Sequence, residues 1–458
     1  MMNRIYLKAI LGGVLLSLIL TGQASAKQEE TCPNIDISGW FPHSTTPEPD
    51  NVNFDSSTIC NFQEWSWQMF LWLTQKSGDK PRFLSFESPY DLLGIENRSV
   101  MMPRTTEAES FDEFLQAGTD GILVDHNGNA VYYSQYLNEA YTKFIRDNFE
   151  NDKNIIDPAL IRGFSPDTPF PVGSIELKAS WKIVEPGEDA SEFYTMDASV
   201  YQLANSGGNI VVDTTKIRKV KLALVGFHIG GIVNGHPEMI WATFEHIKNT
   251  PSVPAKFEPT TIVSNKDFTF YKAGTPYSGC NVNYAGSPYL KLDEATQKLL
   301  PIVEGCLQYE YGNSAENDPI LQASVEKNDK HIKTLNKIVR KHLQDPDEDK
   351  VWSNYREVGS IWFRPTNALK PDMTLATDFA PDGSQFLIGS LKLSNSTIET
   401  FTQYPASVNN CFRCHNTQQR FPPAASDGTH LLPLKPMKLN ISYAFSNIYF
   451  WSQQLPQQ

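Results

Sequence analysis

The sequence predicts a mixed α+β fold, in which a strand-rich part with peripheral helices (residues 27–345) is followed by a small C-terminal part of helix and loop (residues 346–458). The clearest evidence is SIELKASWKIV (174–184), where apolar and polar side chains alternate as in an antiparallel strand with one buried and one wet face. Similar strand-like segments continue to residue 247. Segments with helical periodicity come before and after them, so we expect helices around a sheet.

Two elements before the strands are expected from periodicity and turn chemistry. In NFQEWSWQMFLWLTQK (61–76), large apolar residues recur at helical spacing, which predicts a buried amphipathic helix. Two apolar runs on either side of Asn127-Gly128 predict a hairpin over residues 121–133. Both elements lie within the strand-rich part.

Elements near the C-terminus are expected on similar grounds. Ser396, with Glu399 three residues later, forms a capping box that predicts a short helix over residues 396–404. The remaining expectations are an arm over 27–58, helices over 136–149, 327–344 and 441–455, turns at 207–208, 230–231 and 234–235, a loop-rich stretch over 251–316 and an acidic joint over 345–350.

The N-terminus has the features of a secretory signal. Arg4 and Lys8 form a basic head, residues 9–20 are apolar, and residues 24–26 (Ala-Ser-Ala) supply the small side chains that a signal peptidase needs. An uncleaved anchor helix is the alternative, but a membrane span needs about 20 apolar residues and this run is shorter. We therefore expect residues 1–26 to be removed and the mature protein to be secreted, in the periplasm, without stable membrane insertion.

The charge balance limits the possible partners. The chain has 39 Lys and Arg against 52 Asp and Glu, a net charge of −13, and removal of residues 1–26 with their two positive charges gives −15. This argues against nucleic acid or an anionic membrane surface as a partner. A basic redox partner protein is compatible with it.

Cysteine usage fits an oxidising compartment. Outside the motif described next, four cysteines allow three connectivities, and the pairs that are close in sequence, Cys32–Cys60 and Cys280–Cys306, are the expected disulfides. The alternative is four inert buried thiols, which are less common outside the cytoplasm.

The stretch NNCFRCHNTQQRF (409–421) carries the strongest chemical signal. Cys411 and Cys414 are separated by two residues, and His415 follows at once. A thioredoxin-like dithiol would need a helix that starts at the first cysteine. A zinc site would need four ligands, usually from two similar hooks, and no second such hook exists. Covalent haem is favoured, because the two thiols can add across the haem vinyl groups and the histidine can bind the iron, after export.

This motif resembles that of the c-type cytochromes, over the C-terminal part of the chain. The resemblance implies one covalent haem c with Cys411 and Cys414 as thioether positions and His415 as the proximal iron ligand, and it makes residues 346–458 the haem-bearing region. In small cytochromes c a downstream methionine beside a proline often binds the other iron face. Met437, in KPMKL, is therefore the first candidate distal ligand and His430, in DGTHLL, the second, with an open sixth position as a third possibility.

Most of the mature chain also resembles a less well defined family. The phrases WSWQMFLWL, IELKASWKIV, GFHIGG with IWATFEHIKNTP, and LSNSTIETFTQ are similar to those of large secreted monohaem proteins, which are usually labelled only as cytochrome c family members. This resemblance implies no particular activity.

Three histidines in the strand-rich part form a further candidate group. If the segments containing His228 and His246 pair as neighbouring strands, these two side chains could approach on one face, with His236 near the turn between them. They could serve as a distal haem ligand, a proton donor or a second metal site. The simpler interpretation is two hydrogen-bonded core histidines and one turn histidine.

Three functions follow from these observations. The first is one-electron transfer, which suits a His/Met haem. The second is a haem-dependent oxidoreductase acting on a small substrate held by the strand-rich part, and the third is a haem-based sensor or docking module. The length of the chain exceeds what a simple carrier needs, and the catalytic residues of an enzyme are not evident.

Overall fold

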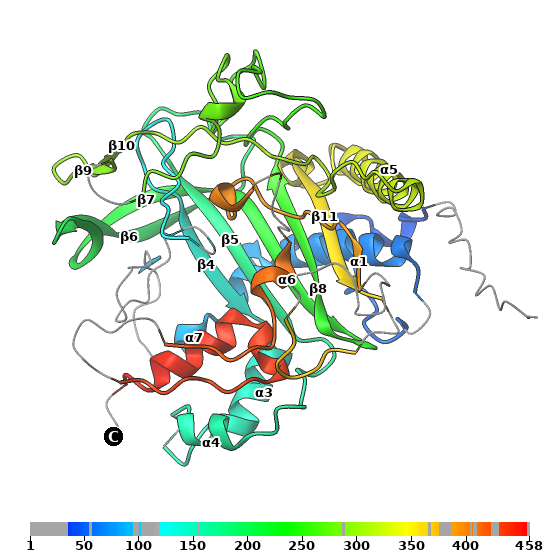
Figure 1. Ribbon diagram of the computed structural model, residues 1–458, viewed down its shortest axis with the longest axis vertical. Coiled ribbons are helices and arrows are strands. Elements are labelled where there is room, and N and C mark those ends of the chain that lie inside the picture. The colour runs from blue at the N-terminus through cyan, green and yellow to red at the C-terminus, as the bar shows by residue number, and fades with distance from the viewer. Residues whose placement is uncertain are drawn as a thin grey trace, which may run out of the picture.

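The computed structural model describes residues 35–54, 57–94, 100–101, 115, 117, 119–153, 155–285, 289–364, 368–374, 386–403, 405, 410–422 and 430–455. A large, mostly antiparallel sheet crosses the molecule, and helices lie on both of its faces (Figure 1). The expected α+β class is thereby confirmed. The predicted signal sequence and Cys32 lie outside the described residues.

The main sheet has eight strands. Their order begins with β12 (Leu387–Gly389), β11 (Tyr355–Phe363), β8 (His236–His246), β7 (Asn209–Val233), β5 (Ile175–Val184) and β4 (Tyr132–Leu137). The long strand β7 also pairs with β6 (Thr195–Ser206), which pairs in parallel with β3 (Val100–Met101). Two small sheets are formed by β1 (Lys76–Ser77) with β2 (Lys80–Pro81), and by β9 (Lys291–Asp293) with β10 (Lys298–Leu300).

Seven α-helices and seven short 3-10 helices are found among the described residues. The α-helices are α1 (Ile59–Thr74), α2 (Pro89–Leu92), α3 (Glu139–Phe149), α4 (Pro158–Gly163), α5 (Pro319–His342), α6 (Cys411–Cys414) and α7 (Tyr443–Ser452). The 3-10 helices are η1 (Ser38–Trp40), η2 (His43–Thr45), η3 (Arg82–Ser85), η4 (Tyr277–Gly279), η5 (Lys350–Asn354), η6 (Thr400–Thr402) and η7 (Lys438–Ile441).

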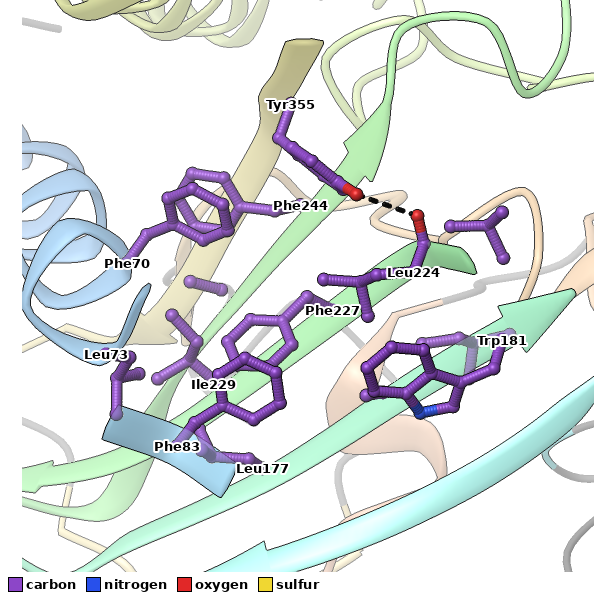
Figure 2. Packing of buried hydrophobic residues seen from close by; sticks show 14 of the residues in the cluster. Phe70, Leu73, Phe83, Leu177, Trp181, Leu224, Phe227, Ile229, Phe244 and Tyr355 are labelled. Atoms are coloured by element: carbon purple, nitrogen blue, oxygen red, sulfur yellow. Dashed lines mark hydrogen bonds between the residues drawn. The ribbon is translucent and has the colours of Figure 1, made fainter. Parts of the chain in front are cut away.

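Helix α1 packs on one face of the sheet, as its aromatic periodicity predicts. Phe70 of α1 stacks on Phe244 of β8 at 4.3 Å between ring centroids and meets Phe227 of β7 edge-on at 5.9 Å (Figure 2). The hydroxyl of Tyr355 on β11 donates to the carbonyl of Leu224 on β7 at 2.8 Å. Burial of each such aromatic side chain contributes about 1.5–3 kcal/mol, so this layer stabilises the sheet strongly.

The opposite face of the sheet is covered by the C-terminal segments. A second hydrophobic cluster there includes Phe412 of α6 and Phe445 of α7, and Figure 1 shows α6 in front of the sheet while α1 lies behind it. The prediction that one face of residues 174–184 is wet is therefore wrong. Glu176 and Lys182 of β5 are 6% and 3% exposed, because neighbouring segments cover them.

Strands from the expected C-terminal part complete the sheet of the expected N-terminal part. Strand β11 pairs antiparallel with β8, and β12 pairs with β11 at the sheet edge. The sequence did not predict either strand. The two parts of the chain are thus joined within a single layer of hydrogen-bonded backbone.

Two local predictions are wrong for identifiable reasons. The pair Gly230-Gly231 lies inside β7 rather than in a turn, and a Cβ added there would meet the rings of Trp241 (3.0 Å) and Trp65 (2.5 Å). Among the described residues of 396–404 only η6 is helical, and the Ser396 N–H, which Glu399 would accept in a capping box, donates to Glu245 (3.1 Å) instead. Tertiary contacts override the local signal in both places.

Other elements agree with the sequence. The helices expected over 136–149, 327–344 and 441–455 correspond to α3, α5 and α7, and the 121–133 stretch turns at Gly128, whose φ of 78° suits glycine. An antiparallel bridge joins Val124 to Ala130 across that turn.

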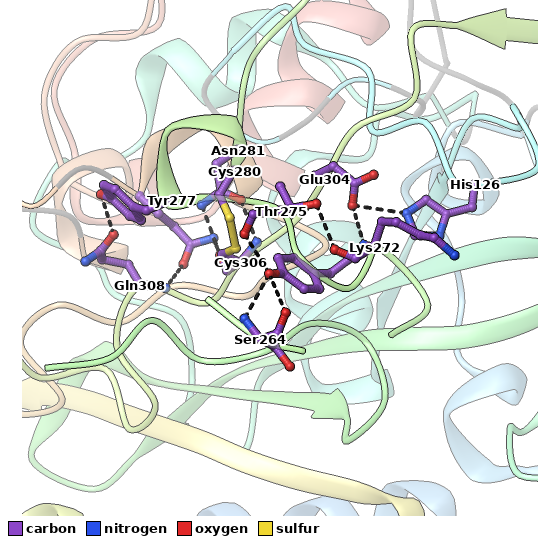
Figure 3. The surroundings of a disulfide bond; sticks show 12 residues. His126, Ser264, Lys272, Thr275, Tyr277, Cys280, Asn281, Glu304, Cys306 and Gln308 are labelled. Atoms are coloured by element: carbon purple, nitrogen blue, oxygen red, sulfur yellow. Dashed lines mark hydrogen bonds and ion pairs between the residues drawn. A yellow bond between two sulfur atoms is a disulfide. The ribbon is translucent and has the colours of Figure 1, made fainter. Parts of the chain in front are cut away.

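The loop-rich stretch carries the disulfide Cys280–Cys306 (Figure 3). Asn281 fixes the surrounding backbone, since its side chain accepts from the Cys306 N–H (2.9 Å) and donates to the Cys306 carbonyl (3.0 Å). Cys60 is also disulfide-bonded.

Candidate functional site

The cysteine–histidine motif forms one helical turn. Cys411 and Cys414 are the first and last residues of α6, and their thiols are free. Residues three apart on a helix lie on the same face, so both thiols point to one side. Phe412 between them is fully buried and packs 4.9 Å from Phe363 of β11, which anchors the turn to the sheet.

The His415 ring is fixed from three sides. Its Nδ1 lies 2.7 Å from the carbonyl oxygen of Ile441, its face lies 3.9 Å from the Trp241 ring, and the Tyr443 ring meets it edge-on at 4.9 Å. A carbonyl can only accept, so Nδ1 carries the proton and the Nε2 lone pair is free. A metal-binding histidine adopts this tautomer when a carbonyl accepts a hydrogen bond from its Nδ1 and Nε2 binds the metal.

The surroundings of His415 keep its ring neutral. Burial lowers its pKa to about 3, although the hydrogen bond to Ile441 opposes this change. The nearby basic groups of Arg420, His228 and Lys178 lower the pKa further. At neutral pH the imidazole is therefore in the form that binds a metal.

Arg420 ties the motif to the segment that follows it. Its guanidinium donates to the carbonyl oxygens of Cys414 (2.9 Å), Asn416 (3.0 Å) and Asn440 (2.9 Å), and it lies 4.6 Å over the Tyr443 ring. The C-terminal carbonyls of a helical turn lack partners within the turn, and Arg420 supplies one.

The environment of the two thiols does not favour a reactive dithiol. Burial raises the pKa of Cys411 well above its ordinary value, and the nearby charges of Glu399 and Cys414 raise it further. Burial and Glu399 also raise the pKa of Cys414. Helix α6 does begin at Cys411, contrary to the sequence prediction, but it spans a single turn. Redox-active dithiols need lowered thiol pKa values.

One member of the histidine group lies on the motif's side of the sheet. His228 of β7 pairs with Thr243 of β8, and Gly230 pairs with Trp241. Alternate residues of a strand share a face, so His228 lies on the same face as the Trp241 ring that contacts His415. The His228 Nε2 is 3.3 Å from a carboxylate oxygen of Glu399.

The other two histidines lie elsewhere. His236 pairs with Glu238 at 2.7 Å beside Phe62 of α1. His246 stacks on Phe193 at 3.8 Å, and its position three residues after Thr243 places it on the opposite face from His228. The predicted approach of His228 to His246 is therefore wrong.

The two candidate distal ligands differ in their surroundings. Met437 is fully buried, and its N–H donates to the carbonyl of Thr417 (3.1 Å), two residues after His415. An antiparallel bridge between Arg420 and Leu434 holds the same two segments together. His430 is exposed.

Sequence reasoning did not identify several residues that shape this site. Trp241 and Arg420 belong to no motif, and the sequence singles out Glu399 only as the second member of the expected capping box. The alternation of IWATFEHI places Trp241 and His246 on different faces of their strand, but which of these faces His228 shares depends on the register with β7, which the sequence does not give.

No protein-family model, curated protein or solved structure matches the chain. Within the described ranges, no three or more His, Cys, Asp or Glu side chains gather so that they could hold a metal ion. None of the helices in these ranges is long and apolar enough to span a membrane.

Proposed function

We propose that this protein is a periplasmic monohaem c-type cytochrome, which binds one haem covalently through Cys411 and Cys414 and exchanges single electrons with a redox partner protein. The observation that carries the proposal is the 2.7 Å contact between His415 Nδ1 and the Ile441 carbonyl, which frees Nε2 next to two thiols on one helical turn. His415 is the proposed proximal ligand, with Met437 as the first distal candidate.

Cys411, Cys414 and His415 fit a covalently bound haem. Both thiols are unpaired and point to one side of α6, and a neutral histidine adjoins them. When bound, the haem iron would supply one-electron chemistry. The chain's own contribution is to hold the His415 ring in place through its contacts with Trp241 and Tyr443.

A second candidate function is a haem-dependent oxidoreductase acting on a small substrate. His228 and Glu399 favour it, because an imidazole and a carboxylate 3.3 Å apart, both mostly buried on the motif's side of the sheet, could hold and move a proton.

Haem attachment is tested by producing the full chain in a host that matures c-type cytochromes. We expect the intact mass to exceed that of the bare mature chain by one haem, and haem staining to survive a denaturing gel. Cys411→Ala or Cys414→Ala should sharply reduce the stain, whereas Cys280→Ala, which removes a cysteine of the distant disulfide, should retain it. A colourless wild-type protein with the mass of the bare chain would refute the proposal.

Absorption spectra separate the two functions. A low-spin haem that does not bind carbon monoxide, with a methionine-to-iron band in the near infrared, supports an electron carrier. A high-spin haem that binds carbon monoxide supports the oxidoreductase. Met437→Ala should remove the near-infrared band if Met437 is the distal ligand.

A further inference from the structure

A cavity of about 450 Å³ lies beside the C-terminal half of α5 and is lined mainly by cationic side chains. Its charged lining consists of Lys333, Lys337, Arg340 and Lys341 from α5, Arg356 from β11 and one carboxylate, Glu310. Five positive charges against one negative charge contrast with the net charge of −13 for the whole chain. Such a local reversal concentrates anions at the cavity.

The lysines form a ridge that lowers the stability of the helix. Lys333, Lys337 and Lys341 are spaced four residues apart and therefore share one face of α5. Like charges at this spacing cost about 0.2–0.5 kcal/mol per pair. Among the described residues, none of the three ammonium groups has an ion-pair or hydrogen-bond partner. The helix dipole favours cations only in the last turn, so it does not explain Lys333 and Lys337.

Two arginines supply hydrogen-bond donors deeper in the cavity. Arg340 donates through Nε to the carbonyl of Ser353 (2.7 Å), which leaves its terminal N–H groups available. Burial lowers the pKa of Arg340, and the adjacent charge of Arg356 lowers it further. Arg356 pairs with Glu245 at 2.9 Å and lies 3.5 Å from Glu310, but its buried Nε has no hydrogen-bond partner among the described residues.

We propose that this cavity binds a small multivalent oxyanion of the phosphate or phosphate-ester class. The guanidinium group presents paired donors that match phosphate geometry, and the lysines add charge around it. The volume falls within the range of small-molecule sites, about 300–1,000 Å³. The site does not depend on the proposed haem. Leu335 and Val339 of α5 belong to the same hydrophobic cluster as α1, whereas Phe412 of the motif belongs to the cluster on the opposite face of the sheet.

The proposal is tested by titrating the full mature chain calorimetrically with inorganic phosphate and with a sugar phosphate, against chloride at matched ionic strength. We expect saturable binding of at least one phosphate-bearing ligand. Lys337→Gln and Arg340→Gln should each weaken it about tenfold, as expected from the loss of one charge-assisted contact. Lys337 is exposed and its ammonium has no bond to lose, so this variant remains informative if Arg340→Gln fails to fold.

Lys330→Gln is the matched control, because Lys330 is an exposed lysine of the same helix that does not line the cavity. Its affinity should stay within about twofold of the wild type. Equal weakening by Lys330→Gln, or no phosphate binding beyond that of chloride, would overturn the proposal. Binding of an acidic peptide without binding of either phosphate would also overturn it and would indicate a docking surface for an acidic protein.

Discussion

Glu357 of β11 is a buried carboxyl group whose environment favours its neutral form. Its side chain is fully buried, and neither carboxyl oxygen has a hydrogen-bond partner among the described residues. Its backbone, in contrast, is paired with the Asn336 side chain through two contacts of 2.9 Å. Burial raises the pKa of Glu357 well above its ordinary value, and the nearby Ser66 hydroxyl opposes only part of this change.

The raised pKa gives the stability a defined pH dependence. Between the ordinary and the raised pKa, the folded protein keeps a proton that the unfolded chain loses. The stabilising contribution is therefore complete below the ordinary value and is lost as pH rises towards the folded-state value, by about 1.4 kcal/mol per pH unit. Glu357→Gln replaces the neutral carboxyl with a group of the same shape that does not titrate. When the pH rises by two units, the unfolding free energy of the variant should therefore increase relative to that of the wild type by up to about 2.7 kcal/mol.

Denaturant unfolding at about pH 5.5 and about pH 7.5 measures this difference, because other titrating groups contribute equally to both proteins. Glu258→Gln is the control, since Glu258 is exposed, and it should show the pH dependence of the wild type. If the difference in unfolding free energy between Glu357→Gln and the wild type were the same at both pH values, Glu357 would have to be ionised in the fold and our reasoning would be wrong.

Three further predictions concern other parts of the chain. Glu245→Gln should destabilise the protein by about 2–3 kcal/mol at neutral pH in the same unfolding assay, because Arg356 would lose its buried counter-charge; equal stability would contradict this. Replacing Cys280 and Cys306 by alanine should cost about 3.5 kcal/mol, as expected for a cross-link with a sequence separation of 26 residues, and an unchanged unfolding midpoint would refute a structural role. His415→Ala should change the visible spectrum of the haem-loaded protein and lower the thermal midpoint, and an unchanged spectrum would exclude the proximal role.

Elements with a strong local signal were predictable from the sequence. The aromatic periodicity of α1 and the alternation in β5 are each contained in a short segment, so no knowledge of the rest of the chain was needed. Strand β11 was missed because it is buried on both faces and shows no strict alternation. The burial of Glu176 and Lys182 depends on segments far away in sequence, and periodicity does not report it.

The candidate site likewise combines residues that the sequence reveals with contacts that only the structure shows. Cys411, Cys414 and His415 lie within five residues, so the motif is visible in the sequence alone. The features that orient the histidine come from distant segments: a ring from β8 and the main-chain carbonyl of the last residue of η7. A carbonyl has no side-chain signature, so Ile441 was not identifiable before its contact was seen.

The position of β11 in the sheet has a consequence for fragments of this protein. A chain that ends at residue 345 would lack both β11 and β12, and the backbone edge of β8 would have no partner from these strands. Unpaired strand edges promote association with other chains, so such a fragment should aggregate. The motif region cannot be separated as a small independent module either, because Phe412 of α6 packs on β11, which is itself a strand of the main sheet.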